Sequence, residues 1–117
     1  MFKLSLDRVL RSLVNLGISE SSAEVYIYLA KEGPKKASEL ANALEISRQQ
    51  LYYNLKKLRE KQIITTSDDK PLIFYAIAFE QVIDLLVTIK KEQSAAILET
   101  KKELLANWRS VDWKNGT

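Results

Sequence analysis

Residues 45–64 read EISRQQLYYNLKKLREKQII, and this stretch predicts a helix with two chemically different sides. Ser47 and Gln50 form an S-x-x-Q capping box, which marks the start of a helix over residues 47–61. The serine oxygen is expected to accept one unpaired backbone N–H, worth ~1 kcal/mol. Apolar residues at helical spacing predict one narrow side that packs on a core. They are Leu51, Leu55 and Leu58.

The opposite side of the predicted helix carries hydrogen-bond donors, an aromatic ring and positive charge. Its outward residues are Gln49, Tyr53, Lys56 and Lys57, with Arg48 at the helix start. Tyr52 lies one residue off this line and is expected at the edge of the core. An ordinary solvated surface would explain these residues, but arginine also pairs bidentately with guanine and glutamine with adenine. Contact with DNA is therefore a hypothesis that the rest of the chain must support.

Composition limits the classes of function. The 117 residues suffice for one domain, or for one domain with an extension, and 46% of them are hydrophobic. Histidine and cysteine are both absent, which removes disulfides, the usual zinc ligands and the commonest general base. We therefore expect no metal, no cofactor and no enzymatic activity. The sequence lacks a membrane-spanning apolar run and a signal-peptide pattern, so a cytoplasmic protein without a membrane partner is expected.

The positive charge is concentrated in one segment of the chain. The net charge is +3. Residues 34–61 hold seven basic and three acidic residues, whereas residues 1–33 and 79–117 each balance. A solvated helical surface is one explanation of such a run. A polyanionic partner is favoured, because the whole excess lies on one short segment.

Hydrophobic periodicity, breakers and β-branched stretches predict the remaining elements. The predicted helices cover residues 6–16, the segment from a cap at Ser19 to Gly33-Pro34, and residues 37–44. The predicted hairpin has strands at 63–67 and 72–78 and a tip at 68–71. A last helix over residues 79–111 contains no Gly or Pro and would be ~45 Å long.

Helix, short helix, turn, capped helix and hairpin is the order of a winged helix-turn-helix. The stretch from LGIS at residues 16–19 to EKQII at residues 60–64 also resembles the N-terminal DNA-binding domain of the TrmB family, mainly archaeal transcriptional regulators. The matching features include Ala23 and Tyr26, a Gly-Pro pair, ASELA and SRQQLYYNLKKL. The resemblance covers about residues 15–90 and implies a winged helix-turn-helix that binds DNA.

Three departures from this family pattern bear on its use. Lys36 stands where members usually have a capping Thr or Ser, so the capping oxygen is missing unless Ser38 replaces it. Gln62 stands where members usually have Gly, so it must avoid a left-handed conformation or accept modest strain. Larger members carry a C-terminal sugar-sensing domain. This chain ends at Thr117, so sugar binding is not carried over and the effector stays unknown.

The N-terminal part of a recognition helix enters the major groove. Ser47 would both cap that helix and present backbone N–H groups to a phosphate. Lys36 precedes the helix that crosses the DNA backbone, and Lys70 lies at the tip of the hairpin beside two repelling aspartates. The candidate DNA contacts are Lys36, Ser38, Ser47, Arg48, Gln49, Tyr53, Lys56, Lys57 and Lys70.

The last predicted helix carries a stripe at steps of mostly four and three residues, as in a coiled coil. A domain of this size cannot cover ~45 Å of helix, so the distal half needs a partner, and a second copy of the chain is the simplest one. The first helix, with Val9, Leu10 and Leu13, is an alternative interface. The predicted dimer contacts are Val82, Leu86, Ile89, Gln93, Ile97, Leu104 and Trp108, and Thr100 lies on the same stripe.

These observations predict a mainly α fold with a small β-hairpin wing (α+β). A winged helix-turn-helix domain over residues 1–78 would be followed by a long dimerisation helix over residues 79–117. The expected function is that of a sequence-specific transcriptional regulator, a homodimer that places residues 47–61 in the major groove of double-stranded DNA. The alternative is a winged-helix module that binds protein and not DNA, whose corresponding helix should expose more apolar and fewer basic residues.

Overall fold

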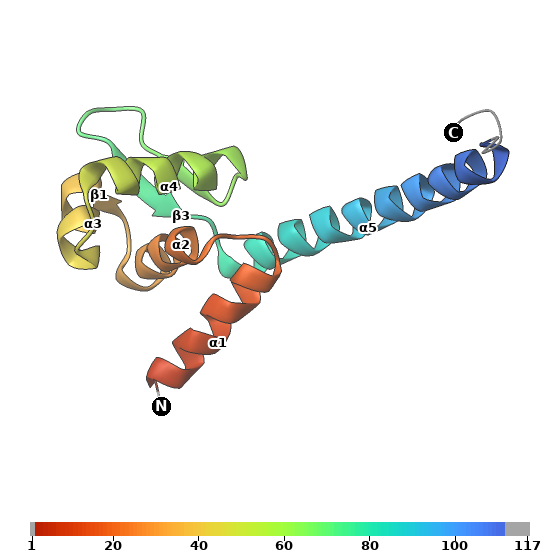
Figure 1. The fold of residues 1–117 in the computed structure, drawn as a ribbon. Helices are drawn as coiled ribbons and strands as arrows, with labels where there is room; N and C mark the ends of the chain where they lie inside the picture. Colours follow the sequence, from red (N-terminus) through yellow and green to blue (C-terminus); the bar gives the residue numbers. More distant parts are fainter. Residues whose placement is uncertain (1, 112–117) are drawn as a thin grey trace.

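The computed structural model describes residues 2–111, which form five helices and three short strands. Helices α2, α3 and α4 and the sheet form a body, from which α1 and α5 extend in different directions (Figure 1). The extended helices give the molecule dimensions of 64 × 33 × 25 Å. In chain order the elements are α1 (Phe2–Asn15), α2 (Glu20–Glu32), β1 (Lys35–Lys36), α3 (Ala37–Leu44), α4 (Arg48–Glu60), β2 (Ile64–Thr66), β3 (Ile73–Ala76) and α5 (Phe79–Ser110).

Capping serines begin two of the helices as predicted. The Ser19 Oγ accepts a hydrogen bond from the Ser22 backbone N–H at 3.2 Å, at the start of α2. The Ser47 Oγ accepts one from the Gln50 backbone N–H at 3.1 Å, at the start of α4. The α3 helix has the predicted bounds, whereas α1 begins at Phe2 and not at residue 6, because no breaker precedes that position. Within the described residues, no helix combines the length and the apolarity that crossing a membrane requires.

One hydrophobic core joins the body to both extended helices. The α2, α3 and α4 helices together supply most of it, and α2 and α4 pack on the small sheet. Leu13 connects α1 to this core, and Val82 and Leu86 connect the first turns of α5. The largest fully buried side chains are Leu13, Val25, Tyr26, Leu29, Leu40, Leu51, Leu55, Leu58, Ile63, Val82 and Leu86.

The sheet has three antiparallel strands in the order β1-β3-β2. The β2–β3 pair is the predicted hairpin, with Thr65 opposite Tyr75. The β1 strand, in which Lys36 lies opposite Ile73, was not predicted. Two consecutive lysines have no strand composition, and only their pairing with a distant segment of the chain makes them a strand.

The two turns that flank α4 each contain a residue in the left-handed conformation. Glu45 has a φ of 54° in the turn between α3 and α4, and Gln62 has a φ of 64° between α4 and β2. Of the two alternatives predicted for Gln62, the strained left-handed conformation is the one that occurs. A non-glycine residue in this region costs roughly 1–2 kcal/mol, because its Cβ approaches the following carbonyl oxygen.

The root of α5 is fixed by two hydrogen bonds to Ile77. The Ile77 backbone N–H donates to the Ile63 carbonyl at 2.9 Å, and the Ile77 carbonyl accepts from the Tyr26 hydroxyl at 2.6 Å. Ile77 lies between β3 and α5, so these bonds tie the start of the long helix to Ile63, the residue before β2, and to α2. The Tyr26 side chain is buried in the core.

The long helix α5 has 32 residues, which at ~1.5 Å per residue makes it about 48 Å long. Val82 and Leu86 on its first turns are only 1% and 2% exposed. The prediction that both lie on a dimer seam is corrected, because the protein's own core covers them. Every residue from Lys90 to Ser110 is exposed, so the predicted lack of cover over the distal half is confirmed.

Replacing Gln62 with glycine should raise the free energy of unfolding by about 0.5–1 kcal/mol, because glycine reaches the left-handed region without a Cβ clash. The matched control is Lys61→Gly at the neighbouring position, whose φ is −85°. Glycine relieves no strain there and should lower the free energy of unfolding. Urea denaturation measures both, and two changes of the same sign would contradict strain at Gln62.

Burial raises the pKa of Tyr26 to about 12 from its ordinary value of 10.0. Between pH 10 and 12 the folded protein keeps the hydroxyl proton that the unfolded chain loses, so stability that is full below pH 10 should decline over this range. At neutral pH, Tyr26→Phe should be less stable than the wild type by about 1–2 kcal/mol, since the Ile77 carbonyl loses its donor. This difference should shrink from pH 10 to 12, and a constant difference in urea denaturation would contradict the prediction.

Candidate nucleic-acid interface

The rotation of α4 about its own axis determines which of its side chains face solvent. Leu51, Leu55 and Leu58 are buried against the core as predicted. The predicted outward residues, together with the helix start, all lie exposed on the other side. They are Ser47, Arg48, Gln49, Tyr53, Lys56 and Lys57.

A buried polar contact also holds this orientation, and sequence reasoning missed it. The Ser22 hydroxyl of α2 donates to the Asn54 Oδ1 of α4 at 3.1 Å, and both side chains are buried. Asn54 lies three residues after Leu51 and four before Leu58, so its spacing already placed it on the inner side. Its Nδ2 has no hydrogen-bond partner among the described residues, so the pair orients α4 more than it stabilises it.

The middle of the exposed side combines an aromatic ring with a positive charge. The Lys57 Nζ lies 5.1 Å from the centre of the Tyr53 ring, within the range of a cation–π contact. Tyr53 is 59% exposed. The contact places the ring and the ammonium group next to each other on the surface, where both can meet the same stretch of a ligand.

The start of α3 is capped in a way that the sequence did not predict. Lys36 occupies the N-cap position, and its backbone N–H donates to the Glu39 Oε1 at 2.9 Å. Ser38 is partly buried and does not take over the missing cap among the contacts of the described residues. The side chain of Lys36 remains exposed beside the body of the protein.

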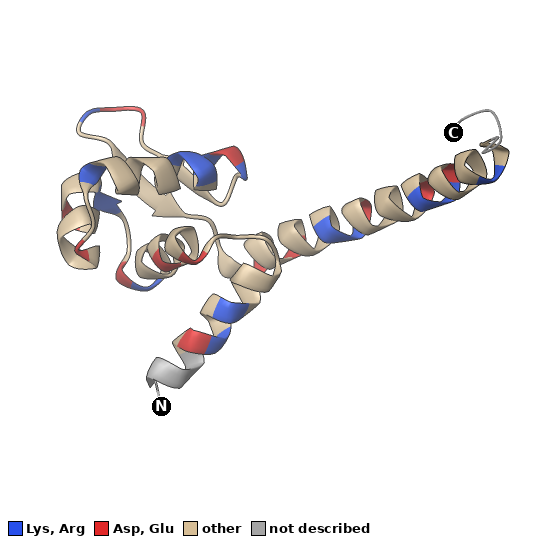
Figure 2. Ribbon diagram, viewed as in Figure 1, with Lys and Arg blue, Asp and Glu red and all other residues tan. Residues whose placement is uncertain are grey.

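The β2–β3 hairpin is the wing, and Ser67 holds the loop at its tip. The Ser67 backbone N–H donates to the Ile73 carbonyl, the Ile73 N–H donates to the Ser67 Oγ at 2.9 Å, and that hydroxyl donates to the Asp69 carbonyl at 3.1 Å. Lys70 is exposed at the tip, next to the two aspartates. Figure 2 shows basic residues along α4, at β1 and at this tip, with acidic residues beside the last.

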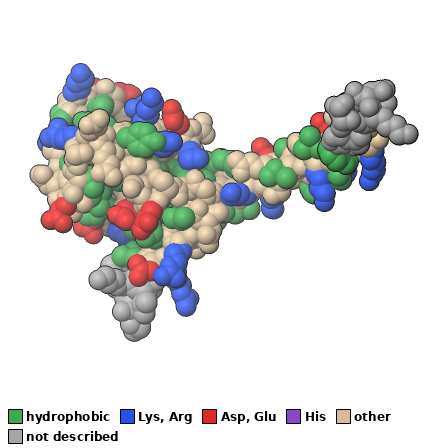
Figure 3. Space-filling view, in the orientation of Figure 1, with side chains coloured by type: hydrophobic (Ala, Val, Ile, Leu, Met, Phe, Trp, Pro, Cys, Tyr) green, Lys and Arg blue, Asp and Glu red, His purple; other side chains and the backbone are tan. Residues whose placement is uncertain are grey.

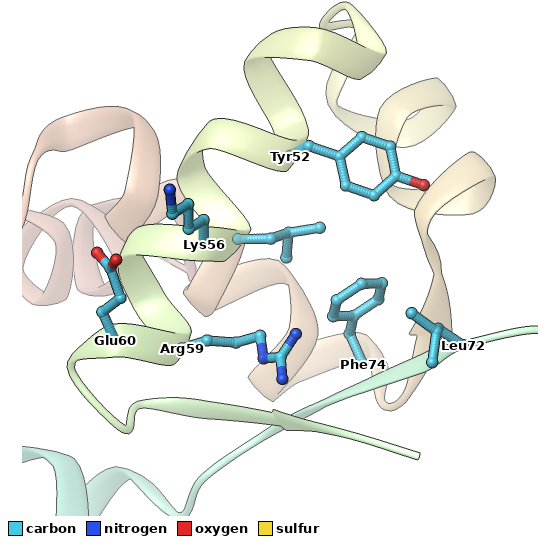
Figure 4. Close-up of a pocket in the computed structure, with 7 residues that line it drawn as sticks. Tyr52, Lys56, Arg59, Glu60, Leu72 and Phe74 are labelled. Carbon is cyan, nitrogen blue, oxygen red and sulfur yellow. The ribbon is translucent and has the colours of Figure 1, made fainter. Parts of the chain in front are cut away.

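A groove separates α4 from the wing side of the sheet, and it contains residues outside the predicted set. Its volume is about 500 Å³, and side chains of α4, of β3 and of Leu72 just before β3 line it (Figure 4). Tyr52 was expected at the edge of the core, yet it is 48% exposed on one wall of this groove. The groove is lined by Tyr52, Leu55, Lys56, Arg59, Glu60, Leu72 and Phe74.

This arrangement can bind a polyanion along an exposed helix. The start of α4 carries hydrogen-bond donors, and its middle carries the Tyr53–Lys57 pair. Further exposed cations lie at β1 and at the wing tip. The pattern has the basic character of a nucleic-acid interface. The structure brings the α4 residues together, whereas Lys36 and Lys70 lie on separate elements.

The family model described as "Sugar-specific transcriptional regulator TrmB" matches residues 7–80. Among solved structures, TrmBL2, an archaeal chromatin protein with a novel mode of DNA binding, is similar with a TM-score of 0.78 and 23% identity, over 89% of this chain and 40% of that one. The transcriptional regulator Tm0710 from Thermotoga maritima matches with a TM-score of 0.58 and 21% identity, over 95% and 92%. MepR, a regulator of the Staphylococcus aureus efflux pump MepA, matches with a TM-score of 0.54 and 15% identity, over 89% and 84%. No curated protein matches the chain.

These similarities confirm the predicted fold, a winged helix-turn-helix with a long C-terminal helix. The chain spans 40% of the length of TrmBL2, so the likeness to that protein concerns its fold. The family model covers more than half of the residues. The chain therefore belongs to the TrmB family of transcriptional regulators.

Proposed function

We propose that the protein is a cytoplasmic, sequence-specific DNA-binding regulator that acts as a homodimer. The observation that carries this proposal is the exposed side of α4, where donors and cations lie on a capped helix whose rotation the core fixes. The major groove of B-DNA admits an α-helix, and each base pair presents there a distinct pattern of donors and acceptors. The fold of transcriptional regulators and the DNA binding described for TrmBL2 support the same proposal.

The α4 residues divide into two roles by position. Arg48 and Gln49, in the first turn, are proposed to read base edges, since the start of a recognition helix enters the groove most deeply. Tyr53 follows one turn later and extends the same contact. Lys56 and Lys57 are proposed to bind phosphates, as are the cap residue Ser47 and the start of α3, with Lys36 and Ser38. Lys70 reaches the backbone from the wing.

The distal half of α5 is proposed to form the homodimer. Large apolar residues lie exposed there, including Ile97 at 67% and Leu104 at 62%, and the space-filling view shows hydrophobic side chains on this arm (Figure 3). At 100° per residue, Leu98 and Leu105 lie beside Trp108 on the flank of the predicted stripe, and they are 59% and 43% exposed. Leu98 and Leu105 therefore join the predicted set, which keeps Ile89, Gln93, Ile97, Leu104 and Trp108.

The two polar residues on the α5 stripe, Gln93 and Thr100, are compatible with an interface between two copies of the helix. Gln93 is exposed and is proposed to fix the register of the two helices, as single polar residues in a seam do. The Thr100 hydroxyl donates to the Ala96 carbonyl of its own helix at 2.9 Å, so it needs no partner across the interface. Leu13 of α1 is buried, which leaves Val9 and Leu10, both partly buried, for the alternative interface.

Gln49→Ala and Lys57→Ala should separate base reading from phosphate binding. Gln49→Ala should cost ~1–3 kcal/mol on a selected binding site and less on random duplex DNA. Lys57→Ala, like Lys36→Ala, should weaken binding to all sequences and reduce the salt slope by about 0.9. Fluorescence anisotropy over a salt series measures both effects.

Lys91→Ala is the matched control, because this exposed lysine lies on α5, away from the α4 surface, and its salt slope should equal that of the wild type. Equal losses on selected and random DNA would make Gln49 a positioning contact. Wild-type protein that shows no salt-dependent binding to duplex DNA would contradict the proposal and favour a protein-binding module.

Ile97→Asp combined with Leu104→Asp should convert the dimer into a folded monomer. Burial of each aliphatic side chain against a partner contributes roughly 1.5–3 kcal/mol, and a buried carboxylate opposes association. Sedimentation equilibrium measures the state of association, and circular dichroism checks the fold. The control pair Ala95→Asp with Ala106→Asp adds the same charges to the opposite side of α5 and should stay dimeric. If the variant with both Ile97→Asp and Leu104→Asp stays dimeric, the interface lies elsewhere, on α1.

A further inference from the structure

The groove between α4 and β3 combines two kinds of surface in one channel. Leu55 and Phe74 form a buried apolar floor, and Tyr52 and Leu72 form walls that are 48% and 38% exposed. In Figure 4 the Arg59 side chain extends along the groove toward Phe74, while Tyr52 lies on the other side of that ring. A ligand that fills this channel must therefore present apolar faces and an anionic group within a few atoms of each other.

We infer that this groove receives one sugar-phosphate strand of the bound DNA. Arg59 is the phosphate contact, and Tyr52 and Leu72 pack against the carbon-bearing faces of the deoxyribose. The inference rests on the proposed function, and it adds three residues that the predicted interface does not contain.

The course of the DNA strands supports this assignment. In a duplex, a sugar-phosphate strand separates the major groove from the neighbouring minor groove. When α4 lies in the major groove and the wing tip reaches the neighbouring minor groove, that strand must pass between them. The channel between α4 and β3 lies on this path, because β3 leads directly out of the wing.

The charges of the channel favour a phosphate. No carboxylate among the described residues forms an ion pair with Arg59 or Lys56, so both cations are available to a ligand. The planar guanidinium presents five donors in a geometry that fits phosphate oxygens. Glu60 is the one acidic residue of the lining, and Figure 4 shows it with Lys56 on the side of α4 away from Leu72. The channel therefore keeps an excess of positive charge where Arg59 enters it.

Arg59→Gln tests the phosphate contact in the full chain. Binding to a duplex, measured by fluorescence anisotropy over a salt series, should lose about 0.9 of its salt slope and weaken roughly five- to tenfold near 0.1 M salt. Arg8→Gln removes the same charge from the exposed surface of α1 and should leave the slope unchanged. Glu60→Gln should strengthen binding, since it removes the one negative charge among the residues that line the channel.

Phosphate ethylation locates the contact on the DNA. One ethylated phosphate beside the α4 site should weaken binding by the wild type and by Arg8→Gln, but not by Arg59→Gln, because the glutamine variant has already lost that contact.

Tyr52→Ala should bind roughly fivefold more weakly with an unchanged salt slope, whereas Tyr52→Phe, which keeps the ring, should bind like the wild type. Equal losses in both Tyr52 variants would overturn the packing of the ring on the sugar.

Two outcomes distinguish this inference from the function on which it rests. If the wild type binds duplex DNA and Arg59→Gln keeps both its salt slope and its ethylation pattern, the inference is overturned and the proposed function stands. If the wild type shows no salt-dependent binding to duplex DNA, both are overturned. Urea denaturation of each variant confirms that the compared proteins are folded.

Discussion

The narrow apolar side of α4 is the constraint on which the interface depends. Leu51, Leu55 and Leu58 bury that side, and the Ser22–Asn54 hydrogen bond adds a directional contact beside them. Successive residues of an α-helix differ by about 100° around its axis, so a small rotation would push charged side chains into the core. The core thus determines which side chains of α4 face solvent and are available to the proposed DNA ligand.

Local patterns in the sequence predicted the helices well, because periodicity and caps are properties of neighbouring residues. Ser19 and Ser47 cap their helices, and the left-handed conformation of Gln62 was one of two expected possibilities. The β1 strand escaped prediction, since two lysines acquire strand geometry only by pairing with β3. The groove beside Tyr52 was not predicted either, because its second wall, with Leu72 and Phe74, is distant from α4 in the sequence.

The long helix shows where hydrophobic periodicity stops being informative. The repeat that begins at Val82 continues to Trp108 and is weakened only by Gln93 and Thr100, yet its first part packs on the protein's own core and its last part is exposed. A stripe records that one side of a helix is apolar and carries no information about which chain covers it. Periodicity likewise predicted that Arg48 and Gln49 are exposed, which the structure confirms. It gives no information about what they contact, so their contacts with bases remain a prediction.

The two hydrogen bonds at Ile77 make α5 a lever with a fixed angle. A rod of about 48 Å that turns by about 5° at its root moves its far end by about 4 Å. In the proposed homodimer the far ends are joined, so the same turn would instead shift the two α4 helices relative to each other. The spacing of the two α4 helices would then depend on the contacts at the root of α5, which are the two Ile77 hydrogen bonds and the packing of Val82 and Leu86. The Tyr26 hydroxyl, which donates one of these hydrogen bonds, would thus affect the distance between the two DNA half-sites without contacting DNA.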